Sequence, residues 1–259
     1  MKVLILENAA AVADRAAETV ACLLRARPDA VLGLATGETM RPVYARLVEL
    51  HRAGRADFAR SVTFNLDEYV GISPDHPASF HSFMQQALFG PVGLPPARCH
   101  LPRGDATDPA AEAERYEAAI ITAGGIDLQL LGIGRNGHLA FNEPTSSLAS
   151  RTRVKTLTET TRQANAPAFA PGPVPRHALT MGIGTILDSR SCLLLATGTA
   201  KAAAVARMIE GPLGADCPAS ALQLHPAVTV ILDQAAAERL ALRDYYETVH
   251  PGGAEADLG

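Results

Sequence analysis

Short apolar runs that alternate with longer helical stretches constrain the fold of this chain more than any other feature. The runs read KVLIL (2–6), VLGLA (31–35), SVTFNL (61–66), IDLQLLGI (126–133), SCLLLAT (191–197) and AVTVIL (227–232). Sequences typical of helices fill the intervals between these runs. The first such helix ends near Arg27, the second begins near Pro42, and the last continues through Tyr246; the others cover 79–89, 111–121 and 200–209. Near-continuous apolar strands separated by helices are typical of βαβ crossovers. We therefore predict an α/β, Rossmann-like fold with a mostly parallel sheet and helices on both faces.

No stretch is long or polar enough to divide the chain into two units. We predict a single domain over residues 1–250, and the 47% hydrophobic content is sufficient for a substantial core. The Pro-rich stretch 166–178 suits an extended surface segment, so a lid is expected within 150–178. The polar tail, 251–259, is expected to be flexible.

Charge, aromatic content and cysteine spacing argue against several classes of protein. A net charge of −4 and the absence of Trp disfavour a broad nucleic-acid surface. The cysteines are far apart and form no CxxC pair, which indicates reduced thiols in a cytoplasmic protein. The apolar start is too short for a signal peptide, and no run approaches the ~20 residues of a membrane helix. The histidines show no HxxEH-like pairing, so we predict no metal, and a homo-oligomer stays open.

Turn-forming stretches follow four of the predicted strands. They read TGET (36–39), DEY (67–69), GIGRNGH (132–138) and TGTAK (197–201). The carboxyl ends of parallel strands lie at one edge of a sheet, where ligands bind in open α/β folds. Loops that converge at one edge can surround one small molecule, and this convergence predicts an active site.

Two of these stretches are suited to binding an anion. The first turn consists of Thr36, Gly37, Glu38 and Thr39. Free backbone N–H groups at the helix start that follows attract anions, although a simple capped turn explains the same residues. Glu38 would repel a phosphate unless its carboxylate points away. Lys201 lies in a first helical turn, where the helix dipole disfavours lysine unless an anion is bound, and a solvated lysine is the alternative.

A third stretch carries adjacent acids. Asp67 and Glu68 follow an apolar strand, where adjacent side chains point opposite ways, so only one can face a cleft. A partly desolvated carboxylate there can have a raised pKa and act as a base. The alternative is a helix or turn cap.

The fourth stretch surrounds a histidine. Gly134 and Gly137 let the backbone approach a ligand closely, and His138 follows them. Most loop histidines are only polar surface residues. Here Glu143 and Asn136 lie close enough in sequence to pair with the imidazole, and a paired carboxylate makes a histidine a better base.

Together with several other segments, these stretches resemble the glucosamine-6-phosphate deaminase (isomerase) family. The matching segments read NLDEYVGI, HPASFHSFM, GIGRNGHLAFNEPTSSLASRTRVKTL, ALTMGIGTILD and LQLHP, in the order of the family, between about residues 31 and 233. The long block around NGH and AFNEP is highly specific. The resemblance implies conversion of glucosamine 6-phosphate and water into fructose 6-phosphate and ammonia, with no cofactor.

The resemblance also implies roles for the candidate residues. Asp67 corresponds to the base that moves a proton between C2 and C1 of the sugar. His138, aided by Glu143 and Asn136, corresponds to the group that opens the pyranose ring. Substrate binding falls to the turn Thr36, Gly37, Glu38 and Thr39, to Gly134 and Gly137, and to Lys201. Ser146, Arg153 and Lys155 match positions that bind an allosteric N-acetyl sugar phosphate in some members.

The chain departs from the family pattern at three positions. Asn136 stands where many relatives have Asp, Glu38 where the phosphate loop usually has Ser or Gly, and Pro167 where a phosphate-binding Arg is usual. The phosphate site thus gains a negative charge and loses a positive one. Either Arg41 or Arg162 compensates, or the substrate is another or an unphosphorylated hexosamine.

Two other functions are compatible with a related fold. A 6-phosphogluconolactonase needs water activation at a lactone and would not be expected to keep DEY together with GHxxFNEP. A sugar-phosphate-sensing domain of a transcription regulator would bring a helix-turn-helix segment, whereas this chain begins directly with a predicted strand.

Overall fold

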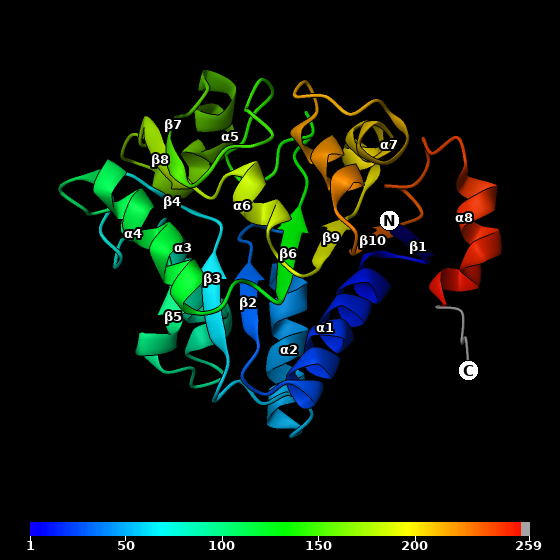
Figure 1. The fold of residues 1–259 in the computed structure, drawn as a ribbon, viewed down its shortest axis with the longest axis horizontal. Helices are drawn as coiled ribbons and strands as arrows, with labels where there is room; N and C mark the ends of the chain where they lie inside the picture. Colours follow the sequence, from blue (N-terminus) through cyan, green and yellow to red (C-terminus); the bar gives the residue numbers. More distant parts are fainter. Residues whose placement is uncertain (255–259) are drawn as a thin grey trace.

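A parallel sheet forms the centre of the protein, of which a computed structural model describes residues 1–254 (Figure 1). Within these residues its strands are β1 (Lys2–Leu6), β2 (Val31–Leu34), β3 (Val62–Asn65), β5 (Cys99–His100), β6 (Leu128–Gly132), β9 (Cys192–Ala196) and β10 (Val228–Asp233). The spatial order is β1-β10-β9-β6-β2-β3-β5, and every neighbouring pair is parallel. The predicted parallel α/β architecture is confirmed.

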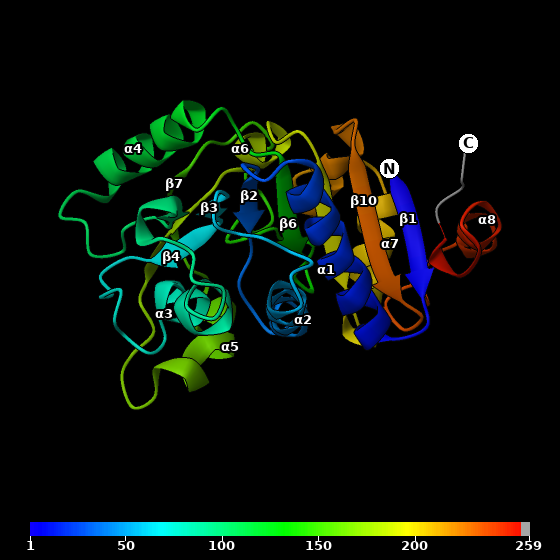
Figure 2. The same cartoon turned by 90° about the horizontal axis from the view of Figure 1, so that it is seen from below.

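Helices cover this sheet and one of its edges. They are α1 (Ala9–Ala26), α2 (Arg41–Arg52), α4 (Pro109–Thr122), α6 (Ile183–Leu187), α7 (Ala202–Glu210) and α8 (Arg243–Val249). Figure 2 shows α1 and α2 side by side against the sheet, and α8 beyond the edge strand β1. The start of α1 follows from Asn8, whose side-chain oxygen accepts a hydrogen bond from the Ala11 N–H at 3.0 Å.

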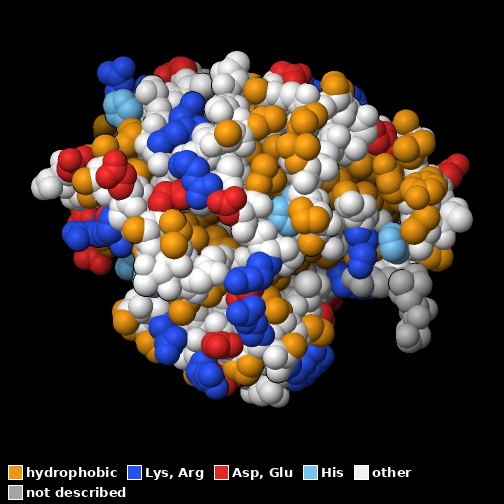
Figure 3. Space-filling model, viewed as in Figure 1, with side chains coloured by type: hydrophobic (Ala, Val, Ile, Leu, Met, Phe, Trp, Pro, Cys, Tyr) orange, Lys and Arg blue, Asp and Glu red, His pale blue; other side chains and the backbone are white. Residues whose placement is uncertain are grey.

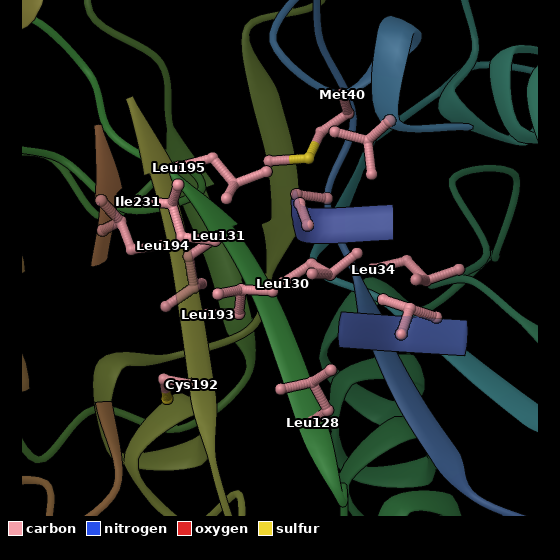
Figure 4. Packing of buried hydrophobic residues seen from close by; sticks show 14 of the residues in the cluster. Leu34, Met40, Leu128, Leu130, Leu131, Cys192, Leu193, Leu194, Leu195 and Ile231 are labelled. Atoms are coloured by element: carbon pink, nitrogen blue, oxygen red, sulfur yellow. The ribbon is translucent and has the colours of Figure 1, made fainter. Parts of the chain in front are cut away.

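Leucines of neighbouring strands interlock in the core. Figure 4 shows Leu130 and Leu131 of β6 beside Leu193 and Leu194 of β9, and all of them are at most 1% exposed. Adjacent residues of one strand point to opposite faces, so both faces of the sheet are buried. Burial on both faces explains why the strand sequences are continuous apolar runs rather than alternating ones.

The protein also has a second, antiparallel sheet, which the sequence analysis did not predict. It consists of β4 (Asp67–Tyr69), β8 (His177–Thr180) and β7 (Arg153–Thr156), in that order. The DEY stretch is therefore a strand, with Asp67 paired opposite Thr180, and not the end of a strand. Its backbone passes so close to Gly104 that a Cβ there would lie 2.1 Å from the Tyr69 carbonyl oxygen. A side chain at position 104 would push this strand away.

Residues 166–178 also differ from expectation. The stretch 166–178 was predicted to be extended, but its first part ends α5 (Glu159–Phe169) and its last residues begin β8. The apolar side chain of Phe169 is the reason, because it is buried against Tyr69 at a ring-centroid distance of 4.9 Å. Aromatic burial here outweighs the helix-breaking tendency of Pro167.

Smaller differences occur at two other places. The helix predicted over 79–89 is α3 (Phe80–Met84) followed by a π-helical turn, Gln85–Phe89. The tail predicted from residue 251 does not begin there, because Gly253 is buried and its carbonyl accepts a hydrogen bond from Arg15 at 3.0 Å. The rest of that predicted tail, 255–259, lies outside the described residues.

The surface carries charges of both signs. On the face seen in Figure 3, Lys and Arg side chains are interspersed with Asp and Glu, and hydrophobic side chains gather over α7 and α8. The exposed hydrophobic residues of this region include Leu213, Leu224, Leu242 and Tyr245. Among the described residues, no helix combines the length and the apolar character needed to cross a membrane.

Candidate active site

The candidate stretches meet at one edge of the parallel sheet. TGTAK follows β9, GIGRNGH follows β6, TGET follows β2 and DEY follows β3. These strands are consecutive in the order β9-β6-β2-β3 and run parallel, so their carboxyl ends lie side by side. Lys201 joins two of these loops directly, because its Nζ donates a hydrogen bond to the Ile133 carbonyl at 2.6 Å.

The two adjacent acids have different surroundings. Glu68 is buried, and its carboxylate accepts hydrogen bonds from the N–H groups of Phe80 at 3.1 Å and His81 at 2.9 Å, so it caps the start of α3. Asp67 is 6% exposed, and its carboxylate has no hydrogen bond or ion pair among the described residues. Burial, with the charge of Glu68 as a smaller cause, raises the pKa of Asp67 to about 8.

The glycines before His138 are needed for close packing. A Cβ on Gly134 would lie 2.2 Å from the imidazole of His138, so the ring lies directly over that backbone. Gly137 has a φ of 82°, and a Cβ there would lie 2.5 Å from Cys217 Sγ. Both positions therefore require glycine, and the turn presents His138 from the end of β6.

Glu143 lies beside His138 and is held by neighbours. Its Oε2 is 3.7 Å from His138 Nδ1, which is longer than a hydrogen bond, so the interaction at this separation is electrostatic. The Asn136 side-chain amide donates to the same Oε2 at 2.6 Å, and Thr161 Oγ1 donates to Oε1 at 2.5 Å. The interaction with His138, followed by these donors, lowers the pKa of Glu143 to about 2. Glu143 is therefore an anion at neutral pH.

Asn136 explains part of this arrangement. Its side-chain Nδ2 donates to Glu143 Oε2, and its Oδ1 accepts a hydrogen bond from the backbone N–H of His138 at 3.2 Å. Aspartate at this position would need a proton to donate to Glu143. Asn136 thus orders the loop without adding a second negative charge.

Hydrogen bonds through β8 join this loop to the acidic strand. The Met181 N–H donates to the Leu66 carbonyl at 2.7 Å, and the Met181 carbonyl accepts from Asn142 Nδ2 at 2.8 Å. Phe141 N–H donates to Thr180 Oγ1 at 3.2 Å, and Thr180 is paired with Asp67. Sequence analysis assigned no role to Asn142 or to Met181. The only available signal was the position of Asn142 between His138 and Glu143.

The TGET turn lies between β2 and α2, with Gly37 at a φ of 110°. The carboxylate of Glu38 is 86% exposed and pairs with Arg41 Nε at 2.9 Å. The positive charge of Arg41 thus reduces the repulsion that the Glu38 carboxylate was expected to exert on an anion. A surface hollow of about 270 Å³ adjoins the turn and is lined by Glu38, Thr39 and Thr197. In the TGTAK loop, burial lowers the pKa of Lys201, and the charge of Arg135 lowers it further.

The predicted second anion site lies on β7 and on the chain that follows Glu143. Arg153 and Lys155 lie two residues apart on β7, and Ser146 has a buried Oγ without a hydrogen-bond partner among the described residues. Among the described residues the Arg153 side chain has one hydrogen bond, which it donates to the Arg151 carbonyl at 3.2 Å, and burial lowers its pKa. Within residues 1–254, no three His, Cys, Asp or Glu side chains form a group that could hold a metal ion.

Fold and site together define an open α/β protein with an acid, a histidine and the TGET turn at the carboxyl edge of its sheet. The chain belongs to the family of glucosamine-6-phosphate isomerases and 6-phosphogluconolactonases, whose model matches residues 6–231. Glucosamine-6-phosphate deaminases of Hahella chejuensis and Shewanella loihica are 54% and 51% identical to it over 250 residues. These matches cover 96% of this chain and 95% and 93% of the relatives.

Solved structures agree with this assignment. A monomeric glucosamine-6-phosphate deaminase superposes with a TM-score of 0.89 at 48% identity, covering 92% of this chain and all of that one (100%). A 6-phosphogluconolactonase from Trypanosoma cruzi has a TM-score of 0.74 at 21% identity over 93% of this chain and 97% of its own. The second likeness shows the shared fold alone.

Replacing Asp67 by Asn should change how stability depends on pH. Folding raises the pKa of Asp67 from 3.8 to about 8, so the folded state holds this proton more tightly than the unfolded state. The associated stability is present at low pH and is lost as pH rises toward the folded pKa. We expect the wild-type free energy of unfolding, from urea titrations, to fall more between about pH 5 and about pH 8 than that of Asp67→Asn. The exposed Asp75→Asn should behave like wild type, and identical pH dependence in wild type and Asp67→Asn would contradict the assignment.

Proposed function

We propose that the protein is an aldose–ketose isomerising deaminase that hydrolyses glucosamine 6-phosphate to fructose 6-phosphate and ammonia. The observation that carries the proposal is that the segments of two proton-transfer groups lie at one sheet edge: buried Asp67, whose carboxylate has no partner among the described residues, and His138 beside anionic Glu143. The deaminases that are about half identical to this chain support it. Its four free cysteines, none in a disulfide, support a cytoplasmic location.

His138 opens the sugar ring in this proposal. Glu143 lies on the Nδ1 side of the imidazole, so the proton is favoured on Nδ1 and Nε2 is left free to act as a base. Nε2 then takes the proton of the O1 hydroxyl and returns one to O5. Ring opening leaves a carbonyl at C1, which acidifies the hydrogen at C2.

Asp67 then carries the C2 proton to C1. A base works best when its pKa is near the working pH, and a carboxylate with its pKa raised to about 8 is far more basic than an exposed one. Moving the proton to C1 converts the amine-bearing C2 into a ketose imine. Addition of water to this imine releases ammonia and leaves fructose 6-phosphate.

The phosphate binds at the TGET turn and Lys201. The turn offers backbone N–H groups at the start of α2, and Lys201 places a cation over the end of β6. Arg135 adds a second positive charge near Lys201, since it lowers the pKa of that lysine. These cations favour a phosphorylated sugar over an unphosphorylated one.

Ammonia release should be measured on glucosamine 6-phosphate, galactosamine 6-phosphate and free glucosamine side by side. We expect the first to be turned over best. Asp67→Asn should lower its turnover by about 10²–10⁴-fold, the usual worth of a positioned base, while calorimetry still detects binding. The control Asp75→Asn should keep wild-type turnover. Near-normal turnover by Asp67→Asn would remove Asp67 from the mechanism, and hydrolysis of 6-phosphogluconolactone without ammonia release would favour the lactonase.

Pro167→Arg tests the phosphate site by adding a positive charge instead of removing a group. Pro167 is exposed on α5, and an arginine there can add a charge-assisted contact to the phosphate. We expect KM for glucosamine 6-phosphate to fall roughly tenfold, as for one such hydrogen bond. Pro167→Ala removes the proline without adding charge and should leave KM unchanged. An equal fall in both variants would show that the helix, not the charge, sets KM.

We further propose that Ser146, Arg153 and Lys155 bind an anionic regulator. The support is that Arg153 has no acidic partner and Ser146 Oγ no hydrogen-bond partner among the described residues. N-acetylglucosamine 6-phosphate should then lower the half-saturating substrate concentration of wild type but not of Arg153→Ala. The same response in both proteins would contradict this role.

A further inference from the structure

One side-chain hydrogen bond joins α5 to the rest of the described chain. Thr161 Oγ1 donates to Glu143 Oε1 at 2.5 Å. The other side-chain hydrogen bonds of the helix and its cap stay within them: Thr158 with Thr161, Arg162 and Gln163 with Glu159, and Asn165 with Thr161. Buried Phe169 anchors the far end of α5 by apolar contact. The only directional link at the start of α5 therefore ends on the carboxylate beside His138.

This link fixes the orientation of the carboxylate. Each oxygen of Glu143 has its own donor, Thr161 for Oε1 and Asn136 for Oε2. Rotation of the carboxylate about its last bond would break both hydrogen bonds. With both in place, Oε2 stays on the side of His138 Nδ1. Without Thr161, one oxygen is free and the rotation is hindered only by Asn136.

The hydroxyl of Thr161 has its proton committed to Glu143. Thr158 Oγ1 accepts from the Thr161 N–H at 3.2 Å and donates to Thr161 Oγ1 at 2.9 Å. Thr161 Oγ1 accepts this hydrogen bond and donates its own hydrogen to Glu143, so the hydrogen bonds run in one direction from Thr158 to Glu143. Thr158 is also the N-cap of α5, which places Glu143 at the positive end of the helix. The start of α5 is thus complementary to an anion.

We propose that Thr161 is a positioning residue, which aligns Glu143 with His138 only while α5 is docked. Docking of α5 then assembles the ring-opening pair, and a displaced α5 leaves Glu143 free to turn away. This inference rests on the proposed deaminase function, because it assigns Glu143 and His138 to ring opening. Thr161 contacts Glu143, and in this proposal it acts through that carboxylate.

Three variants separate the hydroxyl from the shape of the side chain. Thr161→Val removes the donor and keeps the branched shape, whereas Thr161→Ser keeps the donor. Thr160→Val is the matched control, because Thr160 is exposed in the same helical turn and makes no side-chain hydrogen bond among the described residues. We expect Thr161→Val to lower kcat roughly tenfold with KM within about twofold, since a misplaced base slows chemistry more than binding. Thr161→Ser and Thr160→Val should stay within about twofold of wild type.

A double-mutant cycle shows whether Thr161 acts through Glu143. Glu143→Ala removes the acceptor, so adding Thr161→Val should lower kcat no further. Equal loss from Thr161→Val in both backgrounds would indicate a structural role and overturn the inference, as would wild-type kcat in Thr161→Val alone. A wild-type protein that releases no ammonia from glucosamine 6-phosphate would instead overturn the proposed function. Circular dichroism of each variant checks that the fold is kept, and a kcat loss in Thr161→Ser equal to that in Thr161→Val would also count against the hydroxyl.

Discussion

The backbone hydrogen bond from Met181 to Leu66 joins the two sheets at the point where the site is built. Leu66 follows β3 directly, so the bond holds the chain where it leaves the parallel sheet for β4. The carbonyl of the same Met181 accepts from Asn142, which holds the loop between His138 and Glu143. One residue, directly after β8, therefore places the acidic strand and the histidine loop relative to each other. Bonds of this kind are buried and cannot be replaced by water without cost.

The acidic residues of the site differ in their hydrogen-bond donors and therefore in their pKa values. Burial raises the pKa of both Glu68 and Asp67, but three backbone N–H groups donate to the Glu68 carboxylate and offset part of this rise, whereas the Asp67 carboxylate has no donor among the described residues. Glu143 has donors on both oxygens and a lowered pKa. Two carboxylates of the same site are thus driven in opposite directions by their surroundings, which is the usual sign of distinct acid–base roles.

The sequence predicted the part of the structure that depends on local pattern. Continuous apolar runs indicated the parallel sheet because both of its faces are buried, and the turns after those runs located the loops that meet at its edge. The second sheet could not be predicted, because β4 has only three residues and its partners lie more than a hundred positions away. The links from Thr161 to Glu143 and from Met181 to Asn142 left no pattern in the sequence, because each is a single side-chain hydrogen bond formed by tertiary packing. Glu38 was expected to oppose an anion, and only the structure shows its pairing with Arg41.

The pairing of β4 with β8 has a chemical consequence. Side chains alternate between the two faces of a strand, so a slip of one residue would exchange the positions of Asp67 and Glu68. Glu68 would then lie on the face of β4 where Asp67 now has no hydrogen-bond donor. The shorter side chain of Asp67 would lie too far from the start of α3 to cap it. Three paired residues and the glycine at 104 thus decide which of two neighbouring acids is free to exchange protons. Strand alignment here selects chemistry as well as shape.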